Sequence, residues 1–370
     1  MMRRGLDRLI AWLAPAHRQK WARAMQAELA AIGNQRDLLA FALGCLIACC
    51  RFHLERDILI RRMGSGFVTD RFSLFTLAGG LAAGLVGLAY LLVAGAPLTM
   101  LMVNGAAILI GTFLLLGLRV SVRISDDFIM ITACGGAVIL LATAIFGHAV
   151  EEARRWFVIG PFFIQTSLVV LPILVTGFAR LQNRVTLAAM VLAAAAMAIQ
   201  PDRAMAAMLF VAVALVARFR PSRLTFGAAA FCAIAFATTL LLPDRLPAVP
   251  FVDHILWTGF DISLWVGVAL WAGCLLLVCP ILFVRGAERG VPHYVFAGSW
   301  LTLIAAAAMG AYPTPVVGYG ASAIIGYFMG LLFVPPAKEP RLASTDIQPG
   351  SPDLDQQNPP LRSDPASFAF

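Results

Sequence analysis

Charged residues are scarce in this sequence. Asp, Glu, Lys and Arg make up only 13% of its 370 residues, whereas hydrophobic residues make up 60%. Soluble domains have nearer to a quarter charged residues and about half apolar residues. The apolar residues also come in blocks of about 20, the length that a helix needs to cross the hydrocarbon core of a bilayer. The composition therefore indicates an integral membrane protein.

Three other patterns are missing. No short segments of alternating polar and apolar residues occur, as a membrane β-barrel would require, so the apolar blocks predict α-helices. The seven cysteines lie in apolar stretches without a CxxC pair, which argues against disulfide and zinc roles. The N-terminus has no apolar core followed by a small-residue cleavage site, so we expect no cleavable signal peptide.

The charges that are present favour one sign, with a net charge of +8. Such a balance often indicates nucleic-acid binding. Here, however, the basic residues lie between apolar blocks, where Lys and Arg mark cytoplasmic loops. The sequence therefore predicts a membrane protein that contacts lipids and does not bind nucleic acid.

Ten apolar blocks predict an all-α, polytopic protein with about ten transmembrane helices. The predicted spans are residues 72–94, 98–118, 128–147, 156–178, 185–199, 204–217, 224–242, 262–284, 294–312 and 316–334. The fifth and sixth are short and are joined by a polar link that contains Pro201. Two readings are open: a tight hairpin that falls short of full depth, or one long helix, which proline disfavours.

The loop charges predict that both ends of the chain are cytoplasmic. With the N-terminus inside, the cytoplasmic loops hold Arg119, Arg123, Arg180, Arg184, Arg218, Arg220, Arg223, Arg285 and Arg289. The outer loops hold Arg154, Arg155, Arg203 and Arg245, offset by Glu151, Glu152, Asp202, Asp244 and Asp253. This asymmetry follows the positive-inside rule and favours an even number of spans.

The two ends of the chain differ from its middle. Residues 1–66 are basic, and the spacing of Leu6, Leu9, Ile10 and Leu13 predicts an amphipathic helix at the cytoplasmic membrane surface. The apolar run 38–50 is too short for a span and predicts a buried or interfacial helix. Residues 335–370 are rich in Pro, Ser, Asp and Gln, which is typical of a disordered tail.

Four polar clusters interrupt the apolar blocks on the predicted outer side. Polar residues near or inside spans are costly, so each cluster is a candidate functional site. In the first, Arg154 and Arg155 precede Trp156. Paired arginines beside an interfacial tryptophan suit the phosphates of a lipid carrier. Alternatively, the two arginines pair with Glu151 and Glu152 at helical spacing.

The other clusters also allow two readings each. Asp202, after Pro201, precedes a predicted helix and is typical of an N-cap. Asp253 opens the eighth span, with Asp261 nearby, and is either a capping or solvated residue, or a base or metal ligand at the membrane surface. In the fourth cluster, residues 312–322, prolines and glycines either bend the backbone around a cavity or pack helices closely.

The order and spacing of these clusters resemble those of the SEDS family of cell-wall polymerases, of the FtsW/RodA/SpoVE type. The family motifs are GxxVNGARRW followed by QPSE, PDxGTA, HTDFIFAVIGEELGxxG and PLPFxSYGGSS. The matching residues are Gly147, Val150, Ala153, Arg154, Arg155, Trp156, Gln165, Ser167, Pro201, Asp202, Ala206, Asp253, Gly267, Pro313, Pro315, Tyr319, Gly320 and Ser322, with Asp261 in place of a Glu. The resemblance covers about residues 72–334.

The resemblance implies a glycosyltransferase that polymerises lipid-linked peptidoglycan precursor (lipid II) at the outer face of the bacterial cytoplasmic (inner) membrane, in cell division or cell-shape maintenance. Asp253 would be the catalytic base, or the ligand of a divalent cation such as Mg²⁺ or Mn²⁺. Arg154, Arg155 and Trp156 would bind substrate. Further substrate-binding residues would be Gln165, Ser167, Tyr319 and Ser322, and the partner would be a penicillin-binding-type transpeptidase.

The chain also departs from the family pattern, which marks it as a divergent member. Thr166, Leu168 and Leu171 replace the Pro and Glu of QPSE and a following Lys, and the outer loop before Asp253 is short. Two alternatives to the polymerase therefore stand. One is a non-catalytic membrane scaffold or regulator, and the other is a transporter or flippase of a polyprenyl-linked lipid.

Overall fold

The computed structural model describes residues 19–32, 34, 37, 41, 44–45, 71–122, 124–151, 153–242, 246–283 and 289–335. The chain divides into two units, residues 1–338 and 339–370, of which the second lies outside the described residues. The predicted amphipathic positions Leu6 to Leu13, most of the run 38–50 and the predicted tail also lie outside them. Near the N-terminus the structure has the helix α2 (Gln19–Ala31).

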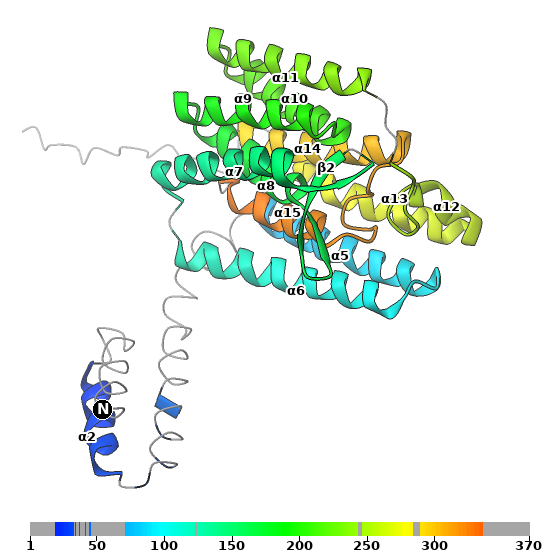
Figure 1. The fold of residues 1–370 in the computed structure, drawn as a ribbon. Helices are drawn as coiled ribbons and strands as arrows, with labels where there is room; N and C mark the ends of the chain where they lie inside the picture. The colour runs from blue at the N-terminus through cyan, green and yellow to red at the C-terminus, as the bar shows by residue number, and fades with distance from the viewer. Residues whose placement is uncertain are drawn as a thin grey trace, which may run out of the picture. The chain divides into compact units, whose positions relative to one another are not determined.

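From residue 71 onward the protein is a helical bundle (Figure 1). Its helices are α5 (Arg71–Val93), α6 (Leu98–Ser121), α7 (Asp126–Phe146), α8 (Thr166–Arg180), α9 (Arg184–Ile199), α10 (Arg203–Phe219), α11 (Arg223–Leu241), α12 (Ile255–Ile262), α13 (Leu264–Val278), η2 (Cys279–Phe283), α14 (Val291–Met309) and α15 (Ala321–Leu332). A sheet of β1 (His148–Val150), β2 (Ala153–Ile159) and β3 (Phe162–Gln165) lies between α7 and α8.

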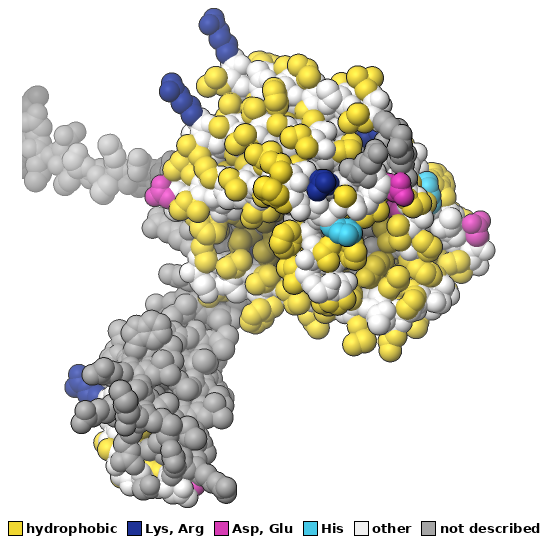
Figure 2. Space-filling view, viewed as in Figure 1, with side chains coloured by type: hydrophobic (Ala, Val, Ile, Leu, Met, Phe, Trp, Pro, Cys, Tyr) yellow, Lys and Arg dark blue, Asp and Glu magenta, His cyan; other side chains and the backbone are white. Residues whose placement is uncertain are grey.

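The bundle confirms the all-α membrane fold. Six helical segments of the described part are long and apolar enough to span a membrane, namely those in α5, α6, α7, α11, α13 with η2, and α14. The shorter apolar helices α8, α9 and α15 also coincide with expected spans. Hydrophobic side chains cover most of the bundle face in Figure 2, and charged ones are few. The number of crossings and the location of the termini stay predictions.

Two predicted spans begin later than expected. The fourth was expected from residue 156, but residues 153–165 form the antiparallel strands β2 and β3, and α8 begins at Thr166. The apolar run misled the prediction because Gly160 adopts a positive φ of 58° and turns the chain back at the middle of it. The tenth was expected from residue 316, but α15 begins at Ala321, after a loop of prolines and glycines.

The fifth and sixth spans are separate helices, which excludes the single long helix. Gln200 ends α9 and Asp202 caps α10, where the Asp202 side chain accepts from the Met205 N–H. The link between the helices is buried inside the protein, because Gln200 is 0% and Asp202 is 1% exposed. With 16 and 17 residues, the two helices are about 24 and 26 Å long. They are therefore shorter than the roughly 30 Å of a hydrocarbon core.

Helix α15 lies at the centre of the bundle and packs on α5, α6 and α8. The buried Tyr327 hydroxyl donates toward the Thr76 and Leu277 carbonyls, 3.2 and 3.1 Å away, on α5 and α13. Gly326 faces α8 so closely that a Cβ atom would lie 1.9 Å from the Leu168 carbonyl oxygen. A glycine is needed there because any side chain would meet backbone.

Candidate functional site

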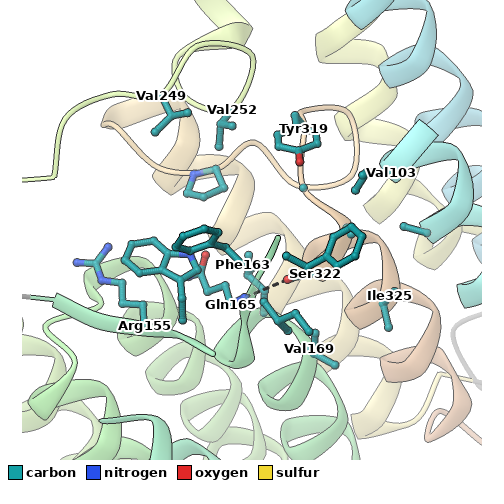
Figure 3. Close-up of a pocket in the computed structure, with 18 of the residues that line it drawn as sticks. Val103, Arg155, Phe163, Gln165, Val169, Val249, Val252, Tyr319, Ser322 and Ile325 are labelled. Carbon is teal, nitrogen blue, oxygen red and sulfur yellow. Dashed lines mark hydrogen bonds between the residues drawn. The ribbon is translucent and has the colours of Figure 1, made fainter. Parts of the chain in front are cut away.

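A single cavity of about 910 Å³ brings residues of all four sequence clusters together (Figure 3). It is lined by residues of the first cluster (Arg155, Trp156, Gln165), the second (Asp202), the third (Asp253) and the fourth (Pro313, Tyr319, Gly320, Ser322). The rest of the lining is mostly apolar and comes from α6, α8, α10, α14, α15, the β2–β3 hairpin and the loops before α12 and α15. The cavity can therefore hold a ligand that has one polar and one apolar part.

Asp253 lies in a loop that pairs with the loop before α15. An isolated antiparallel bridge joins Asp253 to Pro313, and the Thr314 N–H donates to the Val252 carbonyl at 3.0 Å. The Tyr319 N–H donates to the Phe251 carbonyl at 2.8 Å. These bonds place the third and fourth clusters side by side, although about 60 residues of chain separate them.

The Asp253 carboxylate is held by its own loop. Its Oδ2 accepts from the Val249 N–H at 2.8 Å, and its backbone N–H donates to the Val249 carbonyl at 3.0 Å. The side chain is half-buried at the cavity wall and does not cap α12, which begins at Ile255. The interpretation of Asp253 as a helix cap is therefore wrong, whereas its role as a solvated residue, a base or a metal ligand stays a prediction.

Both loops carry strained backbone. Phe251 and Val316 each have a φ of 66°, and His254 has a φ of 58°. The left-handed region is disfavoured for residues with a side chain, most of all for a β-branched one such as valine. Such conformations persist where the surrounding contacts over-determine them, and they concentrate at functional sites.

Asn104, a residue that the sequence analysis missed, fastens the loop of the fourth cluster to α6. Its side-chain amide donates to the Gly318 carbonyl at 3.0 Å and accepts from the Gly320 N–H at 3.1 Å. Asn104 is only 1% exposed. Its signal was present in the sequence, because an amide in the middle of an apolar span is costly without partners.

A buried polar network connects the first, second and fourth clusters. The Gln165 side chain donates to Asp202 Oδ2 at 3.0 Å, and the Ser167 hydroxyl lies 3.3 Å from the same oxygen. The Gln165 backbone N–H donates to the Ser322 hydroxyl at 3.1 Å, drawn dashed in Figure 3. Asp202 Oδ1 accepts from the Met205 N–H, which confirms the N-cap reading. Asp202 thus caps α10 and also orients Gln165 in the cavity wall.

The two arginines bind helix ends. Arg154, which is exposed, reaches the Ile145 and Gly147 carbonyls at the end of α7, at 3.4 and 3.3 Å. Arg155 donates to the carbonyls of Gln200 and Pro201 at the end of α9 and is buried. Cations stabilise helix C-termini because carbonyl oxygens are left unpaired there. Glu151 adopts a positive φ in the turn between β1 and β2, so the helical spacing assumed for pairing with the glutamates is absent.

Several candidate residues lie outside the cavity lining. Asp261 is exposed near the end of the short helix α12. Pro315 is buried in the loop before α15, where its carbonyl accepts from Val317. Ser167 is behind Gln165, and Pro201 contributes its carbonyl to Arg155. Leucines replace the Glu and the Lys of the family pattern. Leu168 lines the cavity, and Leu171 is fully buried.

The described residues could bind a divalent cation only if substrate and water supplied most of its ligands. Among them, no group of three or more His, Cys, Asp or Glu side chains could hold a metal ion. Mg²⁺ is often bound by one or two carboxylates while substrate phosphates and water complete its shell. Asp253 meets that smaller requirement at the cavity wall, whereas a site built from protein ligands alone is not supported.

The fold is similar to that of rod shape determining protein RodA from Thermus thermophilus. Its structure matches with a TM-score of 0.51, and that of an aspartate-to-alanine mutant of the same protein with 0.52. Both are 19% identical to this chain, and each match covers 70% of this chain and 94% of the RodA chain. A chain from a peptidoglycan synthase complex matches with a TM-score of 0.46. No family model and no curated protein matches the sequence.

Proposed function

We propose that this multi-pass membrane protein is a SEDS-like glycosyltransferase that polymerises lipid-linked peptidoglycan precursor at the outer face of the cytoplasmic membrane. The observation that carries the proposal is the shared cavity, because residues of four separate sequence motifs line it. The RodA-like fold supports the same class of protein. A lipid-linked sugar has the polar and apolar parts that such a cavity can accommodate.

Asp253 is the proposed general base. It takes the proton of the attacking sugar hydroxyl while that oxygen forms a bond to the anomeric carbon of the second precursor. The bond from that carbon to the diphosphate oxygen breaks, and the lipid diphosphate leaves. In the alternative role, Asp253 would instead hold a Mg²⁺ or Mn²⁺ ion, which would supply positive charge to neutralise the leaving diphosphate.

The remaining candidates position the substrate. Gln165, fixed by Asp202 and Ser322, presents a firmly oriented amide edge to the cavity. Trp156 and Tyr319 add aromatic faces to its polar part. Arg155 lines the cavity, but its guanidinium group donates to the Gln200 and Pro201 carbonyls, and Arg154 lies outside the lining. A phosphate contact by either arginine therefore requires the side chain to exchange a carbonyl partner for the phosphate. A penicillin-binding-type transpeptidase is the proposed partner.

Purified protein in vesicles with labelled lipid II tests the proposal. We expect glycan polymer from wild type and a loss of at least 100-fold in Asp253→Ala, the lower end of a general-base contribution of about 10²–10⁴. Asp261→Ala is the matched control, because this carboxylate is exposed and outside the cavity, and it should leave polymer formation unchanged. Equal rates for wild type and Asp253→Ala would refute the catalytic role.

Two observations favour a non-catalytic scaffold as the second candidate. Leu168 and Leu171 occupy the positions of the family's charged pair, and both arginines have structural partners. A scaffold would yield no polymer with any candidate transpeptidase, yet would still bind one. Movement of labelled lipid across vesicles without polymer would instead favour a flippase.

A further inference from the structure

The β2–β3 hairpin is unusually apolar for an element outside the helices. From Trp156 to Ile164 the sequence reads WFVIGPFFI and holds no charged residue. The strands are antiparallel, with Phe157 opposite Ile164 and Ile159 opposite Phe162. A hairpin in water normally presents polar side chains on its outer face. This composition therefore indicates an apolar environment on both faces.

Side chains on both faces of the hairpin line the cavity. Trp156 and Phe163 lie on the same side of the strands and belong to its lining, and Figure 3 shows Phe163 in the cavity wall. On the opposite face, Phe157, Ile159 and Phe162 are 54%, 56% and 53% exposed. Ile159, Phe162 and Ile164 of this face line the cavity as well, and Phe163 of the first face is 57% exposed. The hairpin is thus part of the cavity wall, and exposed apolar side chains lie on both of its faces.

The hairpin lies at the depth of the helices. Its tip lines the same cavity as Ile110 of α6, and in the view of Figure 1 the hairpin extends away from β2 toward that helix. Ile110 is 12 residues after Leu98, where α6 begins, which is about 18 Å at 1.5 Å per residue. A point that far along a spanning helix lies within a hydrocarbon core of roughly 30 Å.

The neighbouring surface of α6 identifies what covers the hairpin. At this level α6 exposes Leu109 and Phe113, which are 73% and 76% exposed. In a spanning helix such side chains face acyl chains, and Ile110, the residue after Leu109, lines the same cavity as the hairpin tip. Irregular backbone at membrane depth is tolerated where it lines a cavity, and the two strands also satisfy each other's backbone groups through their pairing.

We propose that the β2–β3 hairpin is embedded in the outer leaflet, with Phe157, Ile159 and Phe162 against lipid acyl chains. It is the wall that separates the apolar part of the cavity from the bilayer. This inference concerns the membrane contact of the hairpin and holds whether or not the protein is a polymerase.

Spin labels in lipid vesicles test the inference. Phe157→Cys and Phe162→Cys, each labelled in a full-length chain whose seven native cysteines are replaced by alanine, report the hairpin. Phe113→Cys on α6 is the lipid reference, and Pro221→Cys in the exposed loop between α10 and α11 is the water reference. The measured quantities are the collision rates of each spin label with oxygen and with a charged or polar nickel complex. Oxygen concentrates in acyl chains, whereas the nickel complex stays in water.

We expect positions 157 and 162 to match position 113, with high collision rates for oxygen and low rates for nickel. A nickel-dominated profile, as expected at position 221, would place the hairpin in water and overturn the proposal. Low collision rates for both reagents would also overturn it, because the face would then be covered by protein. Two hairpin positions keep the test valid if one labelled variant fails to fold, which size-exclusion chromatography reveals.

Discussion

At the scale of single residues, Asn104 stabilises the loop of the fourth cluster, and its replacement should also affect the neighbouring Asp253 loop. Its amide holds both Gly318 and Gly320, and the loop that contains them is bonded to the loop of Asp253. Asn104→Ala leaves the buried Gly318 carbonyl and the half-buried Gly320 N–H without this partner, at a cost of about 1–3 kcal/mol for the buried group and less for the other. We expect a lower Tm in detergent and, if the protein polymerises lipid II, a lower kcat.

Thr112→Val is the matched control for Asn104→Ala. Thr112 lies on the same helix, and its buried hydroxyl has no hydrogen-bond partner among the described residues. Its replacement by an apolar group of the same shape should change Tm little. If Asn104→Ala and Thr112→Val have equal Tm values, the amide does not hold the loop.

The residue types at the site were predictable, but their partners were not. Asp202 was expected as a helix cap, and its side chain does cap α10. The bonds from Arg155 to Gln200 and Pro201 join residues about 45 positions apart, so local spacing pointed to the glutamates instead. Asn104 escaped notice because its partners lie more than 200 residues away, in another cluster.

At the scale of elements, the contact between α15 and α8 depends on Gly326. A Cβ atom there would lie 1.9 Å from a backbone oxygen of Leu168, which can move only if the helices separate. Gly326→Ala should therefore destabilise the protein by about 1–3 kcal/mol or more, since overpacking typically has this cost. The measurement is the Tm of the purified protein in detergent.

Gly227→Ala gives the comparison for that prediction. Gly227 also lies within a helix, α11, but a Cβ atom there would meet nothing within 4 Å. Alanine favours helix over glycine, so Tm should stay the same or rise. An unchanged Tm in Gly326→Ala would show that α8 and α15 are less closely packed than the structure indicates.

Hydropathy predicted most helices but could not separate a strand from a helix in the run 156–164. Both elements bury apolar side chains at membrane depth, and a short apolar run has no periodicity that distinguishes them. The turn at Gly160 and Pro161 was the available signal. Prolines and glycines in the fourth cluster likewise favour a loop, and α15 therefore begins later in the chain than expected.

At the scale of the whole molecule, arginines gather at one end of the bundle. Arg119 bonds the Leu331 carbonyl at the end of α15, and Arg180 bonds the Ile124 carbonyl before α7. The Arg220 side chain bonds Gln182 in the loop between α8 and α9. These contacts bring together loops that were all expected in the cytoplasm. The cavity and the link between α9 and α10 lie at the other ends of these helices.

The positive-inside rule turns this arrangement into a prediction of orientation. Cysteines introduced at Pro221, beside Arg220, and at Val249, in the Asp253 loop, are exposed positions on opposite sides of the predicted membrane. In spheroplasts carrying the cysteine-free background, a membrane-impermeant maleimide should label position 249 directly and position 221 only after lysis. The reverse pattern would place the cavity on the cytoplasmic side, where a polymerase acting on the outer face could not use it. Labelling of both positions before lysis would mean that α11, the helix between them, does not cross the membrane, and the ten-span topology would be wrong.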